Sequence, residues 1–113
     1  MPPTTADRLL HILEAINDIQ TLLTGLTVPE LAADKYRRIA VERFFEIICE
    51  ASRNVPDNVK SQQPDIDWRG MLDFGNQLRH AYHRIEPTLL WDIAERDLPP
   101  LKAFVERMIR NQE

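Results

Sequence analysis

One short stretch, "GNQLRHAYHRI" from Gly75 to Ile85, gathers side chains that can do chemistry in a chain that has only three histidines. Imidazole transfers protons near neutral pH, and guanidinium groups hold phosphate oxygens. On a helical wheel of about 100° per residue, its polar side chains and one preceding arginine gather on one side. They are Arg69, Asn76, Arg79, His80 and His83. This composition favours a site for proton transfer and phosphate stabilisation, although a solvated helix face is the simpler alternative.

The opposite side of the same segment is apolar. A helix that begins around Trp68, capped by Asp65 or Asp67, places five apolar side chains on one stripe. They are Met71, Phe74, Leu78, Ala81 and Ile85. This stripe predicts that the segment packs on a core and turns its polar face outward.

Helical periodicity extends through the rest of the chain, and no segment reads as a strand. Thr4 or Thr5 followed by Asp7 resembles a capping pattern for a first helix that ends near Gly25. A polar loop is expected at 55–64, and the Pro99–Pro100 pair is expected to interrupt the C-terminal pattern. The remaining predicted helices cover 30–54, 87–98 and 101–109. The prediction is an all-α, antiparallel bundle of four to five helices in a single domain, 1–113.

The 30–54 helix carries two apolar lines. The main stripe is expected to face the core and comprises Tyr36, Ile39, Ala40, Phe44, Ile47, Ile48 and Ala51. A second line, formed by Val41, Phe45 and Cys49, makes the helix apolar over more than one face. A second apolar face hints at a partner, and a symmetric homodimer is the commonest oligomer.

Composition excludes several classes of function. The net charge of −4 argues against a protein that wraps nucleic acid by bulk attraction. A single cysteine excludes an internal disulfide framework and suits a reducing cytoplasm. No apolar window suggests a membrane span or an export signal. No cofactor is expected, and neither is a metal site, because no Cys or acidic residue stands at ligand spacing beside His80 and His83.

The segment "WRGMLDFGNQLRHAY" resembles the signature region of HepT-like proteins of the HEPN superfamily, in which an Arg is followed after four to six residues by His-x-Tyr. The segments "RRIAVERFFEIICEA" and "LLWDIAERDLPPLKAFVERMI" resemble other parts of the family. The resemblance implies a four-helix-bundle fold and a metal-independent endoribonuclease toxin, dimeric, with a composite cleft between subunits. It also implies a small nucleotidyltransferase antitoxin that transfers AMP onto the motif Tyr. His80 and Tyr82 match the motif, and Asn76 matches the polar residue that commonly follows the motif Arg.

The motif Arg itself is absent, since Gly75 occupies its usual position. Arg69 or Arg79, from the same or the facing subunit, could replace its charge. Two functions therefore remain open: an active ribonuclease, or a non-catalytic HEPN module that dimerises and binds a nucleotidyltransferase. Gly75 suggests close backbone approach, for which the same helix of the symmetry mate is one candidate, and Gly75→Arg would separate the two functions.

Two of the motif residues have alternative roles. His80 could be a dimer-interface histidine with no part in catalysis. The ring of Tyr82 could pack on the core stripe instead of accepting AMP, unless the helix ends before it.

Overall fold

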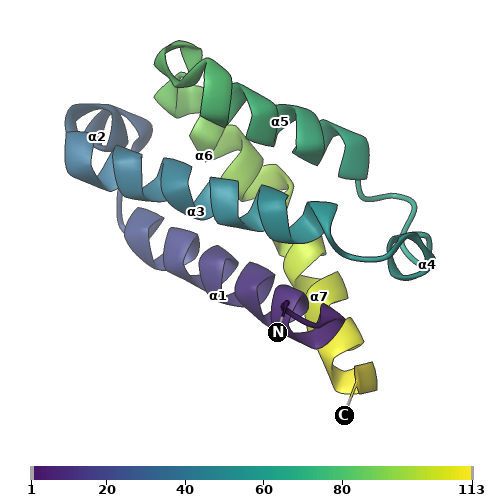
Figure 1. Cartoon of the computed structure of the whole chain (residues 1–113). Coiled ribbons are helices and arrows are strands. Elements are labelled where there is room, and N and C mark those ends of the chain that lie inside the picture. Colours follow the sequence, from purple (N-terminus) through teal and green to yellow (C-terminus); the bar gives the residue numbers. More distant parts are fainter. Residues whose placement is uncertain (1, 113) are drawn as a thin grey trace.

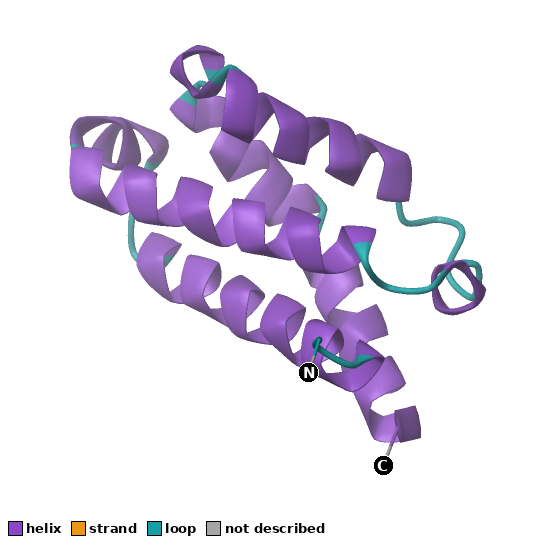
Figure 2. Ribbon diagram, viewed as in Figure 1, coloured by secondary structure: helices purple, strands orange, loops and turns teal. Residues whose placement is uncertain are grey.

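The computed structural model describes residues 2–112, apart from the side chains of Tyr82 and Gln112. All its regular elements are helices, and the described residues contain no strand (Figures 1 and 2). The five longer helices are α1 (Thr5–Leu23), α3 (Lys35–Arg53), α5 (Trp68–His80), α6 (Pro87–Arg96) and α7 (Leu98–Gln112). The short ones are α2 (Val28–Ala33), α4 (Asp57–Lys60) and the 3₁₀ turn η1 (Tyr82–Arg84). The predicted all-α helical bundle is confirmed.

The helices α1, α3 and α5 lie side by side and alternate in direction, while α6 and α7 run behind them (Figure 1). Helix α3 packs on both α1 and α5, and α7 packs on α1 and α6. The largest fully buried side chains fill the space between these layers; among them are Leu9, Ile12, Ile16, Phe45, Ile48, Leu90 and Phe104. Helix α3 is therefore the central support on which α5 rests.

Side-chain caps fix where several helices begin. Thr4 and Asp7 form the expected capping box at α1, each side chain bonding the backbone of the other. The Asp67 carboxylate accepts a 2.8 Å hydrogen bond from the Gly70 N–H and so starts α5 at Trp68. The sequence had left Asp65 and Asp67 as alternatives, and the structure selects Asp67.

The predicted single helix over 30–54 is wrong, because Asp34 divides it into α2 and α3. The Asp34 carboxylate accepts hydrogen bonds from the backbone N–H and the guanidinium of Arg37, which caps α3. Arg37 also donates to the Leu22 carbonyl at 2.7 Å and ties this start to the end of α1. A side chain that caps from inside an apolar pattern is difficult to distinguish from a helical surface residue.

We expect Asp34→Ala to lower the melting temperature. Asp34→Asn should lower it less, since asparagine also caps helices. The bonds from Arg37 lower the pKa of Asp34 below its ordinary value of 3.8. Its stabilising effect is therefore complete above the unfolded-state pKa and is lost as the pH falls through the folded-state pKa. Thermal unfolding of both variants near pH 7 and near pH 3 checks this. A cost of Asp34→Ala that is the same at both pH values would contradict it.

The C-terminal half departs from prediction at three places. The predicted 55–64 loop contains the short helix α4. Pro99 and Pro100 lie in the first turn of α7, where a missing N–H leaves no helical bond unmade. Helix α5 ends at His80, so Ile85 reaches the core through η1 and not as part of the α5 stripe.

The two apolar lines of α3 differ in part from the prediction. The second line, Val41, Phe45 and Cys49, is buried in the core of this same chain together with Ile48 and Ala51 of the main stripe, whereas Tyr36 and Ile39 of that stripe are exposed. The face that suggested a partner is thus covered by α1 and α5. This apolar face therefore no longer supports a homodimer, which stays a prediction.

Candidate functional site

Gly75 lets α5 lie directly against α3. A Cβ atom at this position would be 2.7 Å from Cys49 Cβ and 3.4 Å from Cys49 Sγ, closer than packed carbons allow. Beside this contact, the rings of Phe45 and Phe74 meet edge to face with centroids 5.4 Å apart. The close approach that the sequence predicted is therefore real, but it is made within one chain and not to a symmetry mate.

A polar groove runs along one side of the Gly75–Cys49 contact. Its volume is about 270 Å³, and three arginines, two acids and an amide line it. The full lining is Cys49, Glu50, Arg53, Arg69, Leu72, Asp73, Gly75, Asn76 and Arg79. We call it the arginine groove. It brings together three of the predicted site residues, Arg69, Asn76 and Arg79, and adds Glu50 and Arg53 from α3.

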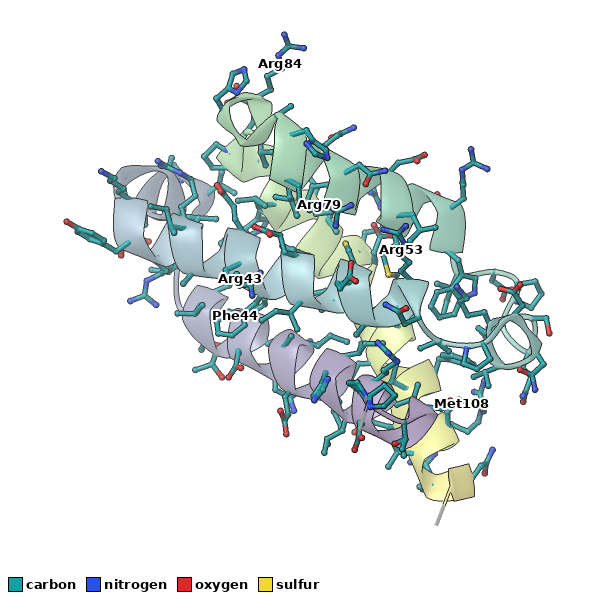
Figure 3. The ribbon with its side chains drawn as sticks, in the orientation of Figure 1. Arg43, Phe44, Arg53, Arg79, Arg84 and Met108 are labelled. Atoms are coloured by element: carbon teal, nitrogen blue, oxygen red, sulfur yellow. The ribbon has the colours of Figure 1, made fainter. Side chains whose placement is uncertain are left out.

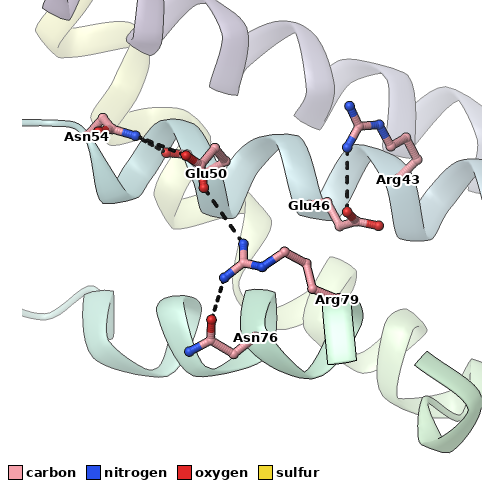
Figure 4. Close-up of polar contacts among 6 residues, drawn as sticks. All are labelled: Arg43, Glu46, Glu50, Asn54, Asn76 and Arg79. Atoms are coloured by element: carbon pink, nitrogen blue, oxygen red, sulfur yellow. Dashed lines mark hydrogen bonds and ion pairs between the residues drawn. The ribbon is translucent and has the colours of Figure 1, made fainter. Parts of the chain in front are cut away.

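Arg79 is held across the groove. Its guanidinium lies 3.7 Å from a Glu50 carboxylate oxygen and donates a hydrogen bond to Asn76 Oδ1 (Figure 4). The Glu50 side chain also accepts a bond of 3.4 Å from Asn54. An ion pair this exposed contributes only about 0–1 kcal/mol to stability. The effect of Glu50 and Asn76 is therefore mainly to orient Arg79.

Arg53 was not among the predicted site residues. It lies in the last turn of α3, and its side chain reaches the space between α3 and α5 near Arg79 (Figure 3). Helical spacing within α5 could not find it, because it comes from another helix. The only signal in the sequence was a lone basic residue at the end of a long apolar segment.

His80 does not line the arginine groove. It is the last residue of α5 and is exposed, on the same side of the helix as Asn76 one turn earlier. Arg69 is also exposed and lies 4.0 Å from Asp73 at the other end of α5. The structure thus places His80 and Arg69 at opposite ends of one polar face, with Asn76 and Arg79 between them.

The helix ends before Tyr82, which is the condition that modification of this tyrosine requires. Ala81 caps α5 with φ −140° and ψ 36°, and Tyr82 begins η1 together with His83. The Tyr82 side chain lies outside the described residues. Its assignment as a modification site stays a prediction.

A second hollow lies on the other side of α5. This cavity of about 460 Å³ is floored by apolar side chains, including Ile48, Met71 and Phe74, and is rimmed by Asp65 and Asp97. Its lining holds one arginine, Arg96, and three aspartates, so acids outnumber cations there. The arginine groove has three arginines and two acids and lies along the face of α5 that ends in His80, so it is the better candidate for phosphate binding.

Cys49 lies between the two hollows and is 3% exposed. Burial raises the pKa of its thiol from 9.0 to about 12, against a smaller lowering by the Arg79 charge. Because the unfolded thiol ionises at lower pH than the folded one, stability should fall as the pH rises from about 9 toward 12.

We expect native Cys49 to resist alkylation by iodoacetamide at pH 8 and to react quickly in denaturant. Mass spectrometry of the alkylated chain measures both rates. Equal rates in the native and the unfolded protein would show that the thiol is accessible and that α5 does not cover it.

Among the described side chains, no three His, Cys, Asp or Glu residues gather closely enough to ligate a metal ion. None of the helices within residues 2–112 combines the length and apolar character that a membrane crossing requires.

Comparison with known proteins agrees with this architecture. The family model described as "Ribonuclease HepT-like" matches residues 12–108. A protein of Thermococcus cleftensis named "Probable ribonuclease HepT" is 36% identical over 102 residues, which are 90% of this chain and 93% of that one. A protein of Methanocaldococcus jannaschii named "Putative RNase MJ1380" is 37% identical over 98 residues, 87% of this chain and 90% of its own. No solved structure gives a significant match.

An all-α bundle whose polar helix face ends at His80, with the sequence His-x-Tyr continuing beyond the helix, defines the class, a HEPN-type helical protein. The chain belongs to the HepT-like ribonuclease family.

Proposed function

We propose that this protein is a metal-independent endoribonuclease, the toxin of a toxin–antitoxin pair, which cuts RNA through attack of the ribose 2′-hydroxyl. The observation that carries the proposal is the polar face of α5, where exposed His80 follows an Arg79 that Glu50 and Asn76 orient. Membership of the HepT-like ribonuclease family supports it.

The chemistry needs two proton transfers and a cation. The 2′-oxygen bonds to phosphorus and loses its proton to a base, while the bond from phosphorus to the 5′-oxygen breaks and that oxygen receives a proton from an acid. Arg79 and Asn76 stabilise the charge on the non-bridging oxygens. Neutral and protonated imidazole can serve as base and acid respectively, but each chain contributes only one His80.

A homodimer would supply the two imidazoles that the reaction needs, one from each chain. With the motif helices of two subunits facing each other, one His80 takes the 2′-hydroxyl proton and the other protonates the leaving oxygen, as in the composite cleft that the family resemblance implies. Sedimentation should therefore show a dimer at micromolar concentration. A monomer that cleaves RNA under those conditions would overturn the composite cleft.

The regulatory part of the proposal concerns Tyr82. A cognate nucleotidyltransferase antitoxin transfers AMP from ATP to its phenol oxygen in the cytoplasm, releasing pyrophosphate and silencing the nuclease. The end of α5 at His80 supports the proposal, because residue 82 follows the helix and is not within it. Incubating the wild type and Tyr82→Phe with the partner and labelled ATP should label only the wild type. Equal labelling of both proteins would show that AMP is attached to a residue other than Tyr82.

A non-catalytic module that dimerises and binds the nucleotidyltransferase is the second candidate, and Gly75 in place of the motif Arg favours it. The deciding experiment compares an RNA oligonucleotide with its 2′-deoxy counterpart, in EDTA, using the purified protein. Cleavage of the RNA alone supports the nuclease. No cleavage of either, with the nucleotidyltransferase still bound, supports the module.

A further inference from the structure

The arginine groove contains one more positively charged side chain than negatively charged ones. Three arginines face two acids there, although the whole chain carries a net charge of −4. Glu50 lies 3.7 Å from Arg79, and Asp73 lies 4.0 Å from Arg69, so each acid already has a partner. Arg53 is the remaining cation of the groove.

Arg53 has no partner among the described residues. Its guanidinium makes neither a hydrogen bond nor an ion pair with them, and the residue is exposed. Its place in the last turn of α3 is also a favourable one for any cation, because the C-terminal end of a helix is partially negative. That effect alone would not require Arg53 to lie in a groove with two further arginines.

The lining of the groove determines which ligand it suits. A planar guanidinium binds phosphate oxygens through two parallel hydrogen bonds. Aromatic side chains are absent from the groove's lining, so it offers no platform on which a base could stack. Its volume of about 270 Å³ is that of a small site. These features suit a sugar-phosphate unit read without regard to base.

We propose that the arginine groove binds a phosphate of a single-stranded RNA and that Arg53 of α3 is a phosphate-binding residue in it. This inference rests on the proposed ribonuclease function and extends it, since Arg53 lies on a different helix from the motif. Arg53 holds the strand while Arg79 stays oriented by Glu50. The site lies along the same face of α5 that ends in His80.

The test uses a fluorescein-labelled 2′-O-methyl oligonucleotide, which keeps every phosphate and lacks the 2′-nucleophile. Binding is followed by fluorescence anisotropy across a range of salt concentrations. The variant is Arg53→Gln, and Arg43→Gln is its matched control. Arg43 lies on the same helix, is exposed, pairs with Glu46 at 3.5 Å and does not line the groove (Figures 3 and 4). Both substitutions remove one positive charge.

We expect Arg53→Gln to weaken binding about tenfold at low salt, and the slope of log K against log salt to fall by about 0.7, as for one lost phosphate contact. Arg43→Gln should stay within about twofold of the wild type, because Arg43 does not line the groove and would contact no phosphate bound there. Melting temperatures of both variants control for folding. Arg53→Lys keeps the charge and loses the planar guanidinium. Its affinity for the oligonucleotide should therefore lie between those of Arg53→Gln and Arg43→Gln.

Equal affinities of the two glutamine variants would overturn the inference, and so would a slope that Arg53→Gln leaves unchanged. A loss of melting temperature in Arg53→Gln without loss of binding would show that Arg53 only complements the end of α3. The probe cannot be cut, so binding that depends on Arg53 is measurable even if the wild type fails to cleave RNA. Failure of the proposed function and failure of this inference therefore give different results.

Discussion

Replacing Gly75 by alanine should destabilise the protein by up to about 2 kcal/mol, and Gly75→Arg should cost more. The added Cβ would lie 2.7 Å from Cys49 Cβ, with both atoms fixed on packed helices. Overpacking of this kind costs about 1–3 kcal/mol, and the gain of about 1 kcal/mol in helix propensity offsets only the lower end of that range. Chemical denaturation of the wild type and the two variants measures the change.

Two substitutions at Cys49 give the control. Cys49→Gly removes the Cβ that causes the overlap, so in that background Gly75→Ala should become nearly neutral or slightly stabilising. Cys49→Ala keeps the Cβ, and Gly75→Ala should then cost about as much as in the wild type. The same cost in both backgrounds would show that the α3–α5 contact is not the cause.

His80→Ala should reduce the rate of RNA cleavage by about 10²–10⁴, the usual contribution of general acid–base catalysis. Because both subunits of the proposed dimer would lose their imidazole, base and acid disappear together, and the effect should lie near the upper end. Single-turnover cleavage of an end-labelled RNA with excess protein measures it. His80 is exposed at the end of α5, so the substitution should leave the melting temperature nearly unchanged.

His11→Ala is the matched control for this loss. His11 is an exposed histidine on α1, which lies on the other side of α3 from α5 (Figure 1), so its removal should leave cleavage unchanged. Cleavage that survives in His80→Ala and falls in His11→Ala would place the chemistry elsewhere. Cleavage that falls equally in both variants would point to a loss of folding or of purity.

The sequence predicted the fold class and several helix starts because these depend on local patterns. The Thr4–Asp7 box, the Asp67 cap and the first-turn Pro87 each act within three residues, and all three are found in the structure. The break at Asp34 was missed because a capping carboxylate and a surface carboxylate look alike in a helical pattern. The buried face of α3 was predicted only in part, because two apolar lines compete there and the packing of α1 and α5 decides which residues are covered.

The candidate site was predicted in part for the same reason. Asn76, Arg79 and His80 share one helix, so their spacing alone put them on one face. Glu50 and Arg53 reach the groove from α3, more than twenty residues earlier in the chain, and no local pattern links them to α5. Gly75 signalled a close contact, but its partner, Cys49, could be identified only when α3 and α5 were seen together.

The central claim, that this chain cuts RNA through 2′-hydroxyl attack served by His80, is tested most directly by the ends of the fragments. Mass spectrometry of the products made in EDTA by the wild type should find a 2′,3′-cyclic phosphate on one side of the cut and a 5′-hydroxyl on the other. Identically purified His80→Ala should yield almost none of these ends. Fragments with 3′-hydroxyl and 5′-phosphate ends, or the same cyclic ends at the same rate from His80→Ala, would contradict it.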